Sequence, residues 1–206
     1  MSILGVNDAL NSVGIPWDLL SKNLSPNEVG VYSSSVFGQV NEEAFGGLFK
    51  SRLRGDRTTS KQVPLALNSM PADFINAYVT GSLGITGHFI GACATSLYNL
   101  NAGVELIKSG KSELVIVGAA EAILGPPAYI GFSAMGAMAT DERMTNLQQL
   151  LGEGEDLDYT KFCRPFGDNM GMVCGESAGF AILMSDRLAL EAVSYTHLRA
   201  HETLRY

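Results

Sequence analysis

Cys93 sits between two alanines where an apolar run ends and a helical pattern begins, in the stretch GHFIGACATSLYNL of residues 87–100. If a helix starts at or just after Cys93, its first backbone N–H groups are unpaired and the positive end of its dipole faces the sulfur. Both effects favour the thiolate, the nucleophilic form of cysteine, and the small neighbours leave room for a bulky acyl group. Most free cysteines, however, are small buried core residues, so the spacing alone leaves a nucleophile and a structural cysteine both open.

Ser177 offers a competing nucleophile, because residues 175–179 read GESAG and match the G-x-S-x-G motif of serine hydrolases. In that motif a helix follows the serine at once, and an acid and a histidine lie farther along the chain. Residues 180–184 instead continue an apolar strand pattern, and the only later histidines are His197 and His201, near the C-terminus. We therefore rank a hydrolase using Ser177 below the cysteine chemistry.

The remaining cysteines and the remaining histidine are expected to be structural. Cys163 and Cys174 have no helix start behind them and are expected to be inert, and His88 is expected to belong to a short strand before Cys93. An odd number of cysteines, no C-x-x-C motif and no signal peptide favour a reducing compartment, which predicts a cytoplasmic protein.

The composition is that of a folded domain, since 46% of the 206 residues are hydrophobic and 17% are charged. The net charge of −7, together with the lack of an arginine-rich arm and of zinc-ligand spacing, argues against general nucleic-acid binding. The most apolar region, residues 114–138, contains Glu121 and the pair Pro126-Pro127, so it does not predict a membrane span.

The elements that must position Cys93 alternate between helices and strands. Before Cys93, apolar periodicity, caps and turn residues predict a helix ending at Gly14, a buried strand within residues 28–37, and a helix from Ser69 as N-cap to Gly81 or Gly84. Around Cys93 they predict a short strand 88–92, a helix 94–109 and an apolar strand 112–122. After these they predict a strand within 171–185 and a helix with Ser185 as N-cap. In the helix 94–109, the expected apolar face is formed by Leu97, Leu100, Val104 and Ile107. Strand, helix and strand in succession with short connections predict a parallel βαβ unit, so the expected fold class is α/β.

The last fourteen residues, VSYTHLRAHETLRY at 193–206, break the composition abruptly and hold two of the three histidines. The run VSYTHLRAHET resembles the in-frame translation of a transposase adapter used for sequencing libraries. We therefore expect residues 193–206 to be a non-native, adapter-derived tail and residues 1–192 to be the native domain, and such a tail is excluded from fold reasoning.

Four segments, in order along the chain, carry a family resemblance. They are GACATS at 91–96, SELVIVGAAEA at 112–122, GFSAMGAMAT at 131–140, and residues 164–191, which begin RPFGDN and contain GESAG. Together they resemble the N-terminal half of the β-ketoacyl-acyl-carrier-protein synthases, members of the thiolase-like superfamily, over about residues 29–191. Two departures stand out: Gly167 separates Phe166 from Asp168, which weakens any role for Asp168, and Ser177 replaces a glycine.

The resemblance implies the N-terminal half of a thiolase-like αβαβα layered fold that lacks the family's first strand. It implies a two-stage reaction in which Cys93 accepts an acyl group from a thioester, and a malonyl-carrier-protein thioester then loses carbon dioxide and condenses with it. No metal or redox cofactor is implied. The family takes two catalytic histidines, a lysine and a second oxyanion-hole amide from its C-terminal half. We therefore expect a condensing enzyme of fatty-acid or related acyl synthesis, present as a fragment that does not complete the condensation.

The same positional match implies roles for further residues. Phe74 falls near the far end of the family's acyl pocket, where it would favour a short acyl primer, and Phe132 falls at a position that gates the nucleophile; ordinary core packing is the alternative for both. A run of basic residues is expected to dock an acidic acyl carrier protein, and the alternative is that the run is only a solvated loop. The run consists of Lys50, Arg52, Arg54, Arg57 and Lys61. The family also implies a homodimer. A non-catalytic dimerisation or scaffold half-fold is the alternative function, and the presence of Cys93 argues against it.

Overall fold

The computed structural model describes all residues except 23, 43, 82–83, 154–155 and 193–206. Its described residues form two compact units, one made of residues 1–122 with 177–192 and the other of residues 123–176. The expected adapter-derived tail lies outside the described residues. Cys93 and the strands β1 to β4 found among the described residues belong to the first unit.

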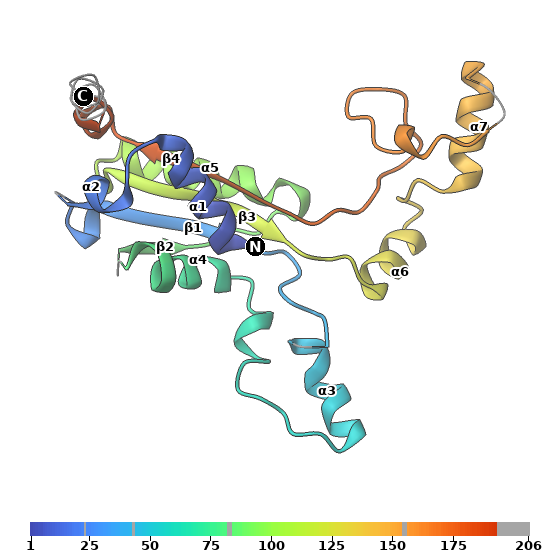
Figure 1. Cartoon of the computed structure of the whole chain (residues 1–206), viewed down its shortest axis with the longest axis horizontal. Helices are drawn as coiled ribbons and strands as arrows, with labels where there is room; N and C mark the ends of the chain where they lie inside the picture. Colours follow the sequence, from blue (N-terminus) through green and yellow to red (C-terminus); the bar gives the residue numbers. More distant parts are fainter. Residues whose placement is uncertain (23, 43, 82–83, 154–155, 193–206) are drawn as a thin grey trace, which may run out of the picture. The chain divides into compact units, whose positions relative to one another are not determined.

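A four-stranded mixed sheet forms the centre of the first unit (Figure 1). Its strands are β1 (Val29–Ser34), β2 (Ile85–Gly87), β3 (Leu114–Glu121) and β4 (Ser177–Met184), and their order across the sheet is β2-β1-β3-β4. β1 runs parallel to both β2 and β3, whereas β4 runs antiparallel to β3. The predicted α/β class with parallel strands is therefore confirmed, with β1 lying between β2 and β3.

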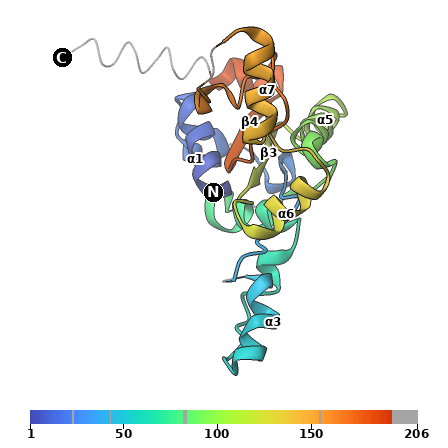
Figure 2. The same ribbon diagram turned by 90° about the vertical axis from the view of Figure 1, so that its right-hand side faces the viewer.

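Helices cover both faces of the sheet, which explains why β3 is apolar at successive positions. α1 (Ser2–Val13) and α4 (Met70–Ile75) pack on one face, and α5 (Thr95–Lys108) packs on the other, so that Figure 2 shows the sheet between α1 and α5. The buried cluster between the sheet and the first pair of helices includes Val6, Leu10, Val31, Ile75, Leu114 and Ile116.

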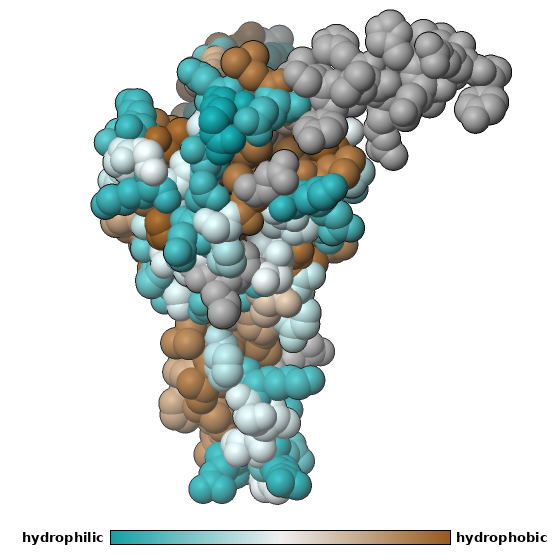
Figure 3. Space-filling model, turned by 90° about the vertical axis from the view of Figure 1, so that its left-hand side faces the viewer, coloured by the Kyte–Doolittle hydropathy of each residue, from teal (hydrophilic) through white to brown (hydrophobic). Residues whose placement is uncertain are grey.

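The first unit also contains α2 (Trp17–Ser21), α3 (Phe45–Arg54) and a short helix at residues 186–192. α3 ends at Gly55, whose φ of 79° is a conformation that glycine adopts without strain. Apolar side chains gather over α3 in Figure 3, where Phe45, Phe49 and Leu53 recur every four residues and are exposed. Short segments of 3-10 or π geometry complete the unit: Pro26–Glu28, Pro64–Ala66, Asn76–Thr80 and Ala92–Ala94.

The second unit consists of α6 (Pro126–Ala134), α7 (Asp141–Leu151), a 3-10 turn at Tyr159–Lys161 and their connecting loops. Thr140 is the N-cap of α7, because its hydroxyl accepts a hydrogen bond from a first-turn N–H group at 3.4 Å. α7 ends at Gly152, which has a φ of 68°. Both ends of α7 are therefore set by local capping residues.

Several elements predicted from caps and turn residues are confirmed. α1 ends at Gly14 in a left-handed conformation with φ of 73°, and the helical segment that starts with α4 ends at Gly81. The Oγ of Ser185 accepts a backbone hydrogen bond at 3.2 Å and caps the helix 186–192. Ser69 is the N-cap residue of α4, as predicted, although its side chain makes no capping hydrogen bond.

The strand predicted for residues 88–92 is absent. β2 ends before it, and His88 is exposed rather than part of a strand. The backbone of Phe89 bonds to side chains instead of to a neighbouring strand: its N–H donates to Oδ1 of Asn99 at 2.8 Å, and its carbonyl accepts from Oγ of Ser34 at 2.7 Å. The apolar run is therefore a loop held by polar side chains.

The buried face of α5 also differs from the prediction. Its buried residues are Thr95, Asn99 and Gly103, whereas Leu97 is 62% exposed. The helix lies close against the valine side chains of β3, so its sheet-facing positions hold small or hydrogen-bonded residues instead of large apolar ones.

Candidate active site

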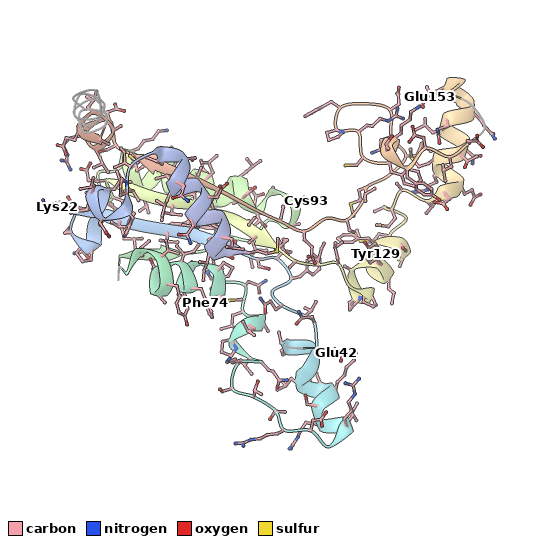
Figure 4. All side chains as sticks on the ribbon, in the orientation of Figure 1. Lys22, Glu42, Phe74, Cys93, Tyr129 and Glu153 are labelled. Atoms are coloured by element: carbon pink, nitrogen blue, oxygen red, sulfur yellow. The ribbon has the colours of Figure 1, made fainter. Side chains whose placement is uncertain are left out.

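Cys93 lies in the middle of the single 3-10 turn Ala92–Ala94, which leads directly into α5 at Thr95. The predicted helix start just after Cys93 is therefore confirmed. Cys93, labelled in Figure 4, is exposed, so it is not the buried core cysteine that the sequence also allowed. The N-cap residue of α5, Ala94, makes no side-chain capping bond, which leaves the first N–H groups of the helix without that partner.

A cavity of about 270 Å³ opens beside Cys93. Ala119 and Glu121 of β3 and Ser177 and Gly179 of β4 contribute to its wall. The antiparallel register explains why they meet, because Glu121 pairs with Ser177 and Ala119 pairs with Gly179. Three of these four side chains are small or absent, so the cavity is open next to the thiol.

Ser177 shares the cavity with Cys93, a juxtaposition that the sequence does not predict. β4 starts at Ser177, so the strand predicted within residues 171–185 is shorter than expected. Because a strand and not a helix follows Ser177, the elbow that a G-x-S-x-G hydrolase requires is not formed. The hydrolase alternative is therefore wrong, and Ser177 is a wall residue of the cavity.

The turn that carries Cys93 has an unusual backbone. Ala92 has a φ of 49°, in the left-handed region that residues other than glycine seldom adopt. The Oγ1 of Thr95 accepts a hydrogen bond from the N–H of Gly91 at 3.0 Å and donates to the carbonyl of Ala92 at 2.7 Å. A Cβ at Gly91 would lie 2.1 Å from the ring of Tyr98, so a larger residue there would displace that ring. Such strain persists only where the surroundings hold it, and Thr95 supplies one of the constraints.

Glu121 connects the end of β3 to the loop after β1. Its Oε1 accepts a hydrogen bond from the backbone N–H of Val36, and its Oε2 is buried with no hydrogen-bond partner among the described residues. A buried carboxylate oxygen without a partner costs free energy, which is typical of a functional site. From sequence, Glu121 stands out only as an interruption of an apolar run. Its position at the end of a buried strand is the signal that points to the site.

Asn99 is a second residue near Cys93 for which the sequence pattern suggested no role. It is fully buried on α5 and bonds to the backbone of Phe89, which precedes Cys93 by four residues. The available signal is spacing, because Thr95, Asn99 and Gly103 recur every four residues and mark a polar or small face of the helix.

The two aromatic residues expected near the acyl group lie on helices. Phe74 is on α4, on the sheet face opposite α5, and its ring packs against Tyr78 with centroids 5.4 Å apart (Figure 4). Phe74 is half-buried and is not among the described residues that line the cavity at Cys93. Phe132 lies on α6 in the second unit. The roles of Phe74 and Phe132 stay predictions.

Part of the predicted docking run is already paired within the chain. The carboxylate of Glu42 contacts Nζ of Lys50 at 2.5 Å and Nη1 of Arg54 at 3.3 Å. The hydrogen bond from Lys50, followed by the charges of Lys50 and Arg54, holds the pKa of Glu42 below its usual range. Three basic residues form no ion pair with any described residue and give this segment its positive charge: Arg52, Arg57 and Lys61.

The other two cysteines lie in different surroundings from Cys93. Cys163 is exposed in a loop, and Cys174 is partly buried with its sulfur 3.7 Å from that of Met138. Across the described part of the chain, no cluster of three or more His, Cys, Asp or Glu residues has the arrangement of a metal site. None of the described helices is long and apolar enough to cross a membrane.

Known proteins match this chain over nearly its whole length. Residues 1–189 match the family model for the beta-ketoacyl synthase, N-terminal domain. The chain is 46% identical over 197 residues to beta-ketoacyl-[acyl-carrier-protein] synthase FabY of Pseudomonas aeruginosa, a match that covers 96% of this chain and 30% of FabY. It is 27% identical over 162 residues to 3-oxoacyl-[acyl-carrier-protein] synthase 2 of Staphylococcus aureus, with 77% of this chain and 36% of that protein covered. The chain thus spans about a third of the length of these relatives.

Solved structures give the same assignment. The crystal structure of the noncanonical ketosynthase FabY from P. aeruginosa matches with a TM-score of 0.83 and 47% identity, over 93% of this chain and 29% of that one. A beta-ketoacyl synthase from Burkholderia phymatum matches in fold, with a TM-score of 0.67 and 24% identity over 92% of this chain and 42% of that one. The predicted thiolase-like fold class is therefore confirmed, and the chain belongs to the β-ketoacyl synthase family through its N-terminal domain.

Proposed function

We propose that this chain supplies the acyl-accepting part of a β-ketoacyl synthase, with Cys93 as its nucleophile. The observation that carries the proposal is the placement of Cys93, which is exposed on a single turn before α5 and lines a cavity whose wall is built largely of small residues. The family assignment supports the same chemistry, because the relative FabY is by name a β-ketoacyl-acyl-carrier-protein synthase.

In the proposed first stage, the Sγ of Cys93 attacks the carbonyl carbon of an acyl thioester. The tetrahedral intermediate carries negative charge on the former carbonyl oxygen, which backbone N–H groups stabilise, that of Cys93 among them. When the intermediate collapses, the bond between the carbonyl carbon and the carrier sulfur breaks. The carrier leaves as a thiol with the proton that Cys93 gave up, and the acyl group stays on Cys93 as a thioester.

In the proposed second stage, a malonyl thioester on the carrier protein loses carbon dioxide and leaves an enolate. The enolate carbon attacks the acyl-cysteine carbonyl, a carbon–carbon bond forms, and the sulfur of Cys93 is released. The family resemblance assigns the histidines that assist this stage to the C-terminal half, and this chain spans 30% of FabY. We therefore propose that the chain accepts the acyl group without completing the condensation, and that neither stage uses a metal or redox cofactor.

The proposed macromolecular partner is an acidic acyl carrier protein that docks on α3 and the loop after it. The positive charges of Arg52, Arg57 and Lys61, which form no ion pair with a described residue, support this site because charge complementarity steers such encounters. Lys50 and Arg54 contribute less, since Glu42 neutralises part of their charge. A homodimer and a reducing, cytoplasmic location are further proposals. The odd number of cysteines and the lack of a C-x-x-C motif support the location.

Two aromatic residues are proposed to shape the acyl site, Phe74 by limiting chain length and Phe132 by gating Cys93. The half-burial of Phe74 against Tyr78 fits either a pocket wall or ordinary core packing. Replacing the matching phenylalanine of a full-length relative by alanine separates the two, because a pocket wall predicts that longer acyl chains are accepted. Unchanged chain-length selectivity would remove the role of Phe74.

Acyl transfer to Cys93 is tested by incubating the purified chain with short- and medium-chain acyl thioesters of coenzyme A and of acyl carrier protein. Intact-mass and peptide mass spectrometry are expected to show one acyl group on the peptide that contains Cys93, released by hydroxylamine. A Cys93→Ala variant should remain unmodified, and the matched double variant Cys163→Ser/Cys174→Ser should still be acylated. Equal acylation of all three cysteines, or none at Cys93, contradicts the nucleophile role. A β-ketoacyl product after addition of malonyl-carrier protein would refute the proposed stop at the acyl-enzyme.

A further inference from the structure

Asn99 is a polar side chain that is fully buried inside a helix, where each of its polar atoms needs a partner. Its Nδ2 donates to Oγ of Ser34 at 2.8 Å and to the carbonyl of Gly118 at 3.0 Å. Its Oδ1 accepts from the backbone N–H of Phe89 at 2.8 Å. Asn99 therefore links β1, β3 and the loop before Cys93 at one buried point.

Ser34, which is also fully buried, closes a ring of hydrogen bonds. Its Oγ accepts from Asn99 and donates to the carbonyl of Phe89 at 2.7 Å. Both backbone polar groups of Phe89 are thereby held, and its ring stacks on Tyr32 with centroids 5.9 Å apart. Because Phe89 precedes Cys93 by four residues, the ring fixes the upstream end of the segment that carries the thiol.

The downstream end of the same segment is fixed by Thr95, which bonds to the backbone of Gly91 and Ala92. Thr95 and Asn99 lie four residues apart and face the sheet from the same side of α5. Between the two anchors, Ala92 has the strained φ of 49°. A strained residue of this kind relaxes unless the structure on both sides of it is held in place.

We propose that Asn99 is a positioning residue for Cys93. Through its ring with Ser34 and Phe89 it holds the turn Ala92–Ala94 in its strained conformation, and so keeps the sulfur at the start of α5. This inference rests on the proposed role of Cys93 as a nucleophile. Asn99 acts on the turn alone and is assigned no contact with the acyl group.

A purely structural role for Asn99 makes a different prediction. Loss of its side chain deprives the Phe89 N–H and the Ser34 hydroxyl of a partner, which lowers stability whatever the role. If the role of Asn99 is purely structural, Cys93 reacts at its normal rate in those variant molecules that stay folded. With a positioning role, Cys93 reacts more slowly even in folded molecules. The deciding quantity is the reactivity of Cys93 per folded molecule.

The test measures alkylation of each cysteine by iodoacetamide in the full 206-residue chain. Peptide mass spectrometry follows the rates at about pH 7 and about pH 9.5, at a temperature where circular dichroism shows every variant folded. The test variants are Asn99→Ala and Ser34→Ala. Asn101→Ala is the matched control, because Asn101 is exposed on the same helix, and Ile75→Val lowers stability from the opposite face of the sheet.

Asn99→Ala is expected to slow the alkylation of Cys93 about tenfold relative to that of Cys163 at neutral pH. At the higher pH the slowing should be less than about threefold, because the helix start contributes less to the reactivity of a thiol in alkaline solution. Ser34→Ala should slow it about threefold at neutral pH, because Asn99 keeps its bonds to Gly118 and Phe89. The two control variants should leave the ratio of the Cys93 and Cys163 rates within about twofold of its starting value.

A folded Asn99→Ala variant whose Cys93 reacts within about twofold of the unsubstituted chain at both pH values overturns the positioning role. If Asn99→Ala does not fold, Ser34→Ala decides, and an unchanged ratio of rates then overturns it. Alkylation does not require acyl transfer, so the two proposals fail separately. If Cys93 is never acylated but is alkylated more slowly in Asn99→Ala, only the proposed function is wrong. If Cys93 is acylated and its alkylation rate does not change in Asn99→Ala, only the positioning role is wrong.

Discussion

Gly103 of α5 lies directly against Val117 of β3, so closely that a Cβ on Gly103 would come within 2.4 Å of Cγ1 of Val117 and 3.0 Å of Cδ1 of Leu183. Glycine in a helix interior costs about 1 kcal/mol relative to alanine, so helix propensity does not explain the glycine at position 103. The close packing of α5 on the sheet explains it. The contact limits how far apart the helix and the sheet lie at this point.

Gly103→Ala is therefore expected to lower the free energy of unfolding by about 1–3 kcal/mol, because overpacking outweighs the gain in helix propensity. Urea denaturation followed by circular dichroism measures the change. Combining Gly103→Ala with Val117→Ala should recover part of the loss relative to the sum of the single variants. Asn101→Ala, on the exposed face, should change stability by less than about 1 kcal/mol. A Gly103→Ala variant more stable than the unsubstituted chain would show that α5 is free to move outward.

The three cysteines are expected to react at different rates with a slow alkylating agent at neutral pH. Cys93 should react first, at least about fivefold faster than Cys163, because it lies at a helix start whereas Cys163 is exposed in a loop. Cys174 should react last, since it is partly buried against Met138. Mass spectrometry of the three peptides over time gives the rates. Equal reactivity of all three thiols would favour the scaffold half-fold over the acyl-accepting enzyme.

The features that were predicted correctly from sequence alone depend mainly on signals from neighbouring residues. The turn residue that ends α1, the cap Ser185 and the helix start behind Cys93 follow from a few neighbouring residues, and each is confirmed. The apolar strand at β3 follows from burial on both faces. The family assignment followed from four ordered motifs and not from periodicity, and the comparisons confirm it.

What the sequence did not reveal depends on partners far along the chain. Residues 88–92 have the composition of a strand, but the backbone of Phe89 bonds to Asn99, 10 residues away, and to Ser34, 55 residues away. The cavity likewise requires the antiparallel register that brings Ser177 beside Glu121. Periodicity within one segment carries no information about such partners, because tertiary contacts override local preference.

Carrier-protein binding is expected to depend on which basic residue is changed. Arg52→Glu should weaken binding of an acidic acyl carrier protein about three- to tenfold at low salt, because its charge is not paired with a described carboxylate. Lys50→Glu should weaken it less, since Glu42 already neutralises part of the Lys50 charge. Fluorescence anisotropy with labelled carrier protein at low and high salt gives the dissociation constants.

The control for the docking prediction is Lys22→Glu, which changes the net charge by the same amount at an exposed site at the end of α2. Figure 4 shows Lys22 and Glu42 at separate ends of the first unit. If Arg52→Glu and Lys22→Glu weaken binding equally, the effect reports net charge alone and the α3 docking site is wrong.

The second unit is expected to respond to acid through Glu153. Its carboxylate contacts Nζ of Lys161 at 2.9 Å and Nη1 of Arg164 at 3.4 Å. The hydrogen bond from Lys161, followed by the charges of Lys161 and Arg164, holds the pKa of Glu153 below its ordinary value of 4.5. The folded unit therefore binds this proton more weakly than the unfolded chain does. The stabilisation is complete above the unfolded pKa and is lost as the pH falls through the folded one.

Lys161→Gln is accordingly expected to raise the titration midpoint of Glu153 toward 4.5 and to flatten the loss of stability between about pH 5 and pH 3. Carboxyl-carbon NMR of the glutamate side chains measures the midpoint, and thermal melts across the same pH range measure the stability. Lys108→Gln removes an exposed lysine that contacts a different glutamate, Glu105, and should leave the Glu153 midpoint where it is. A Glu153 midpoint that does not move in Lys161→Gln would mean that another group controls this carboxylate, since the ion pair is the physical reason for the shift.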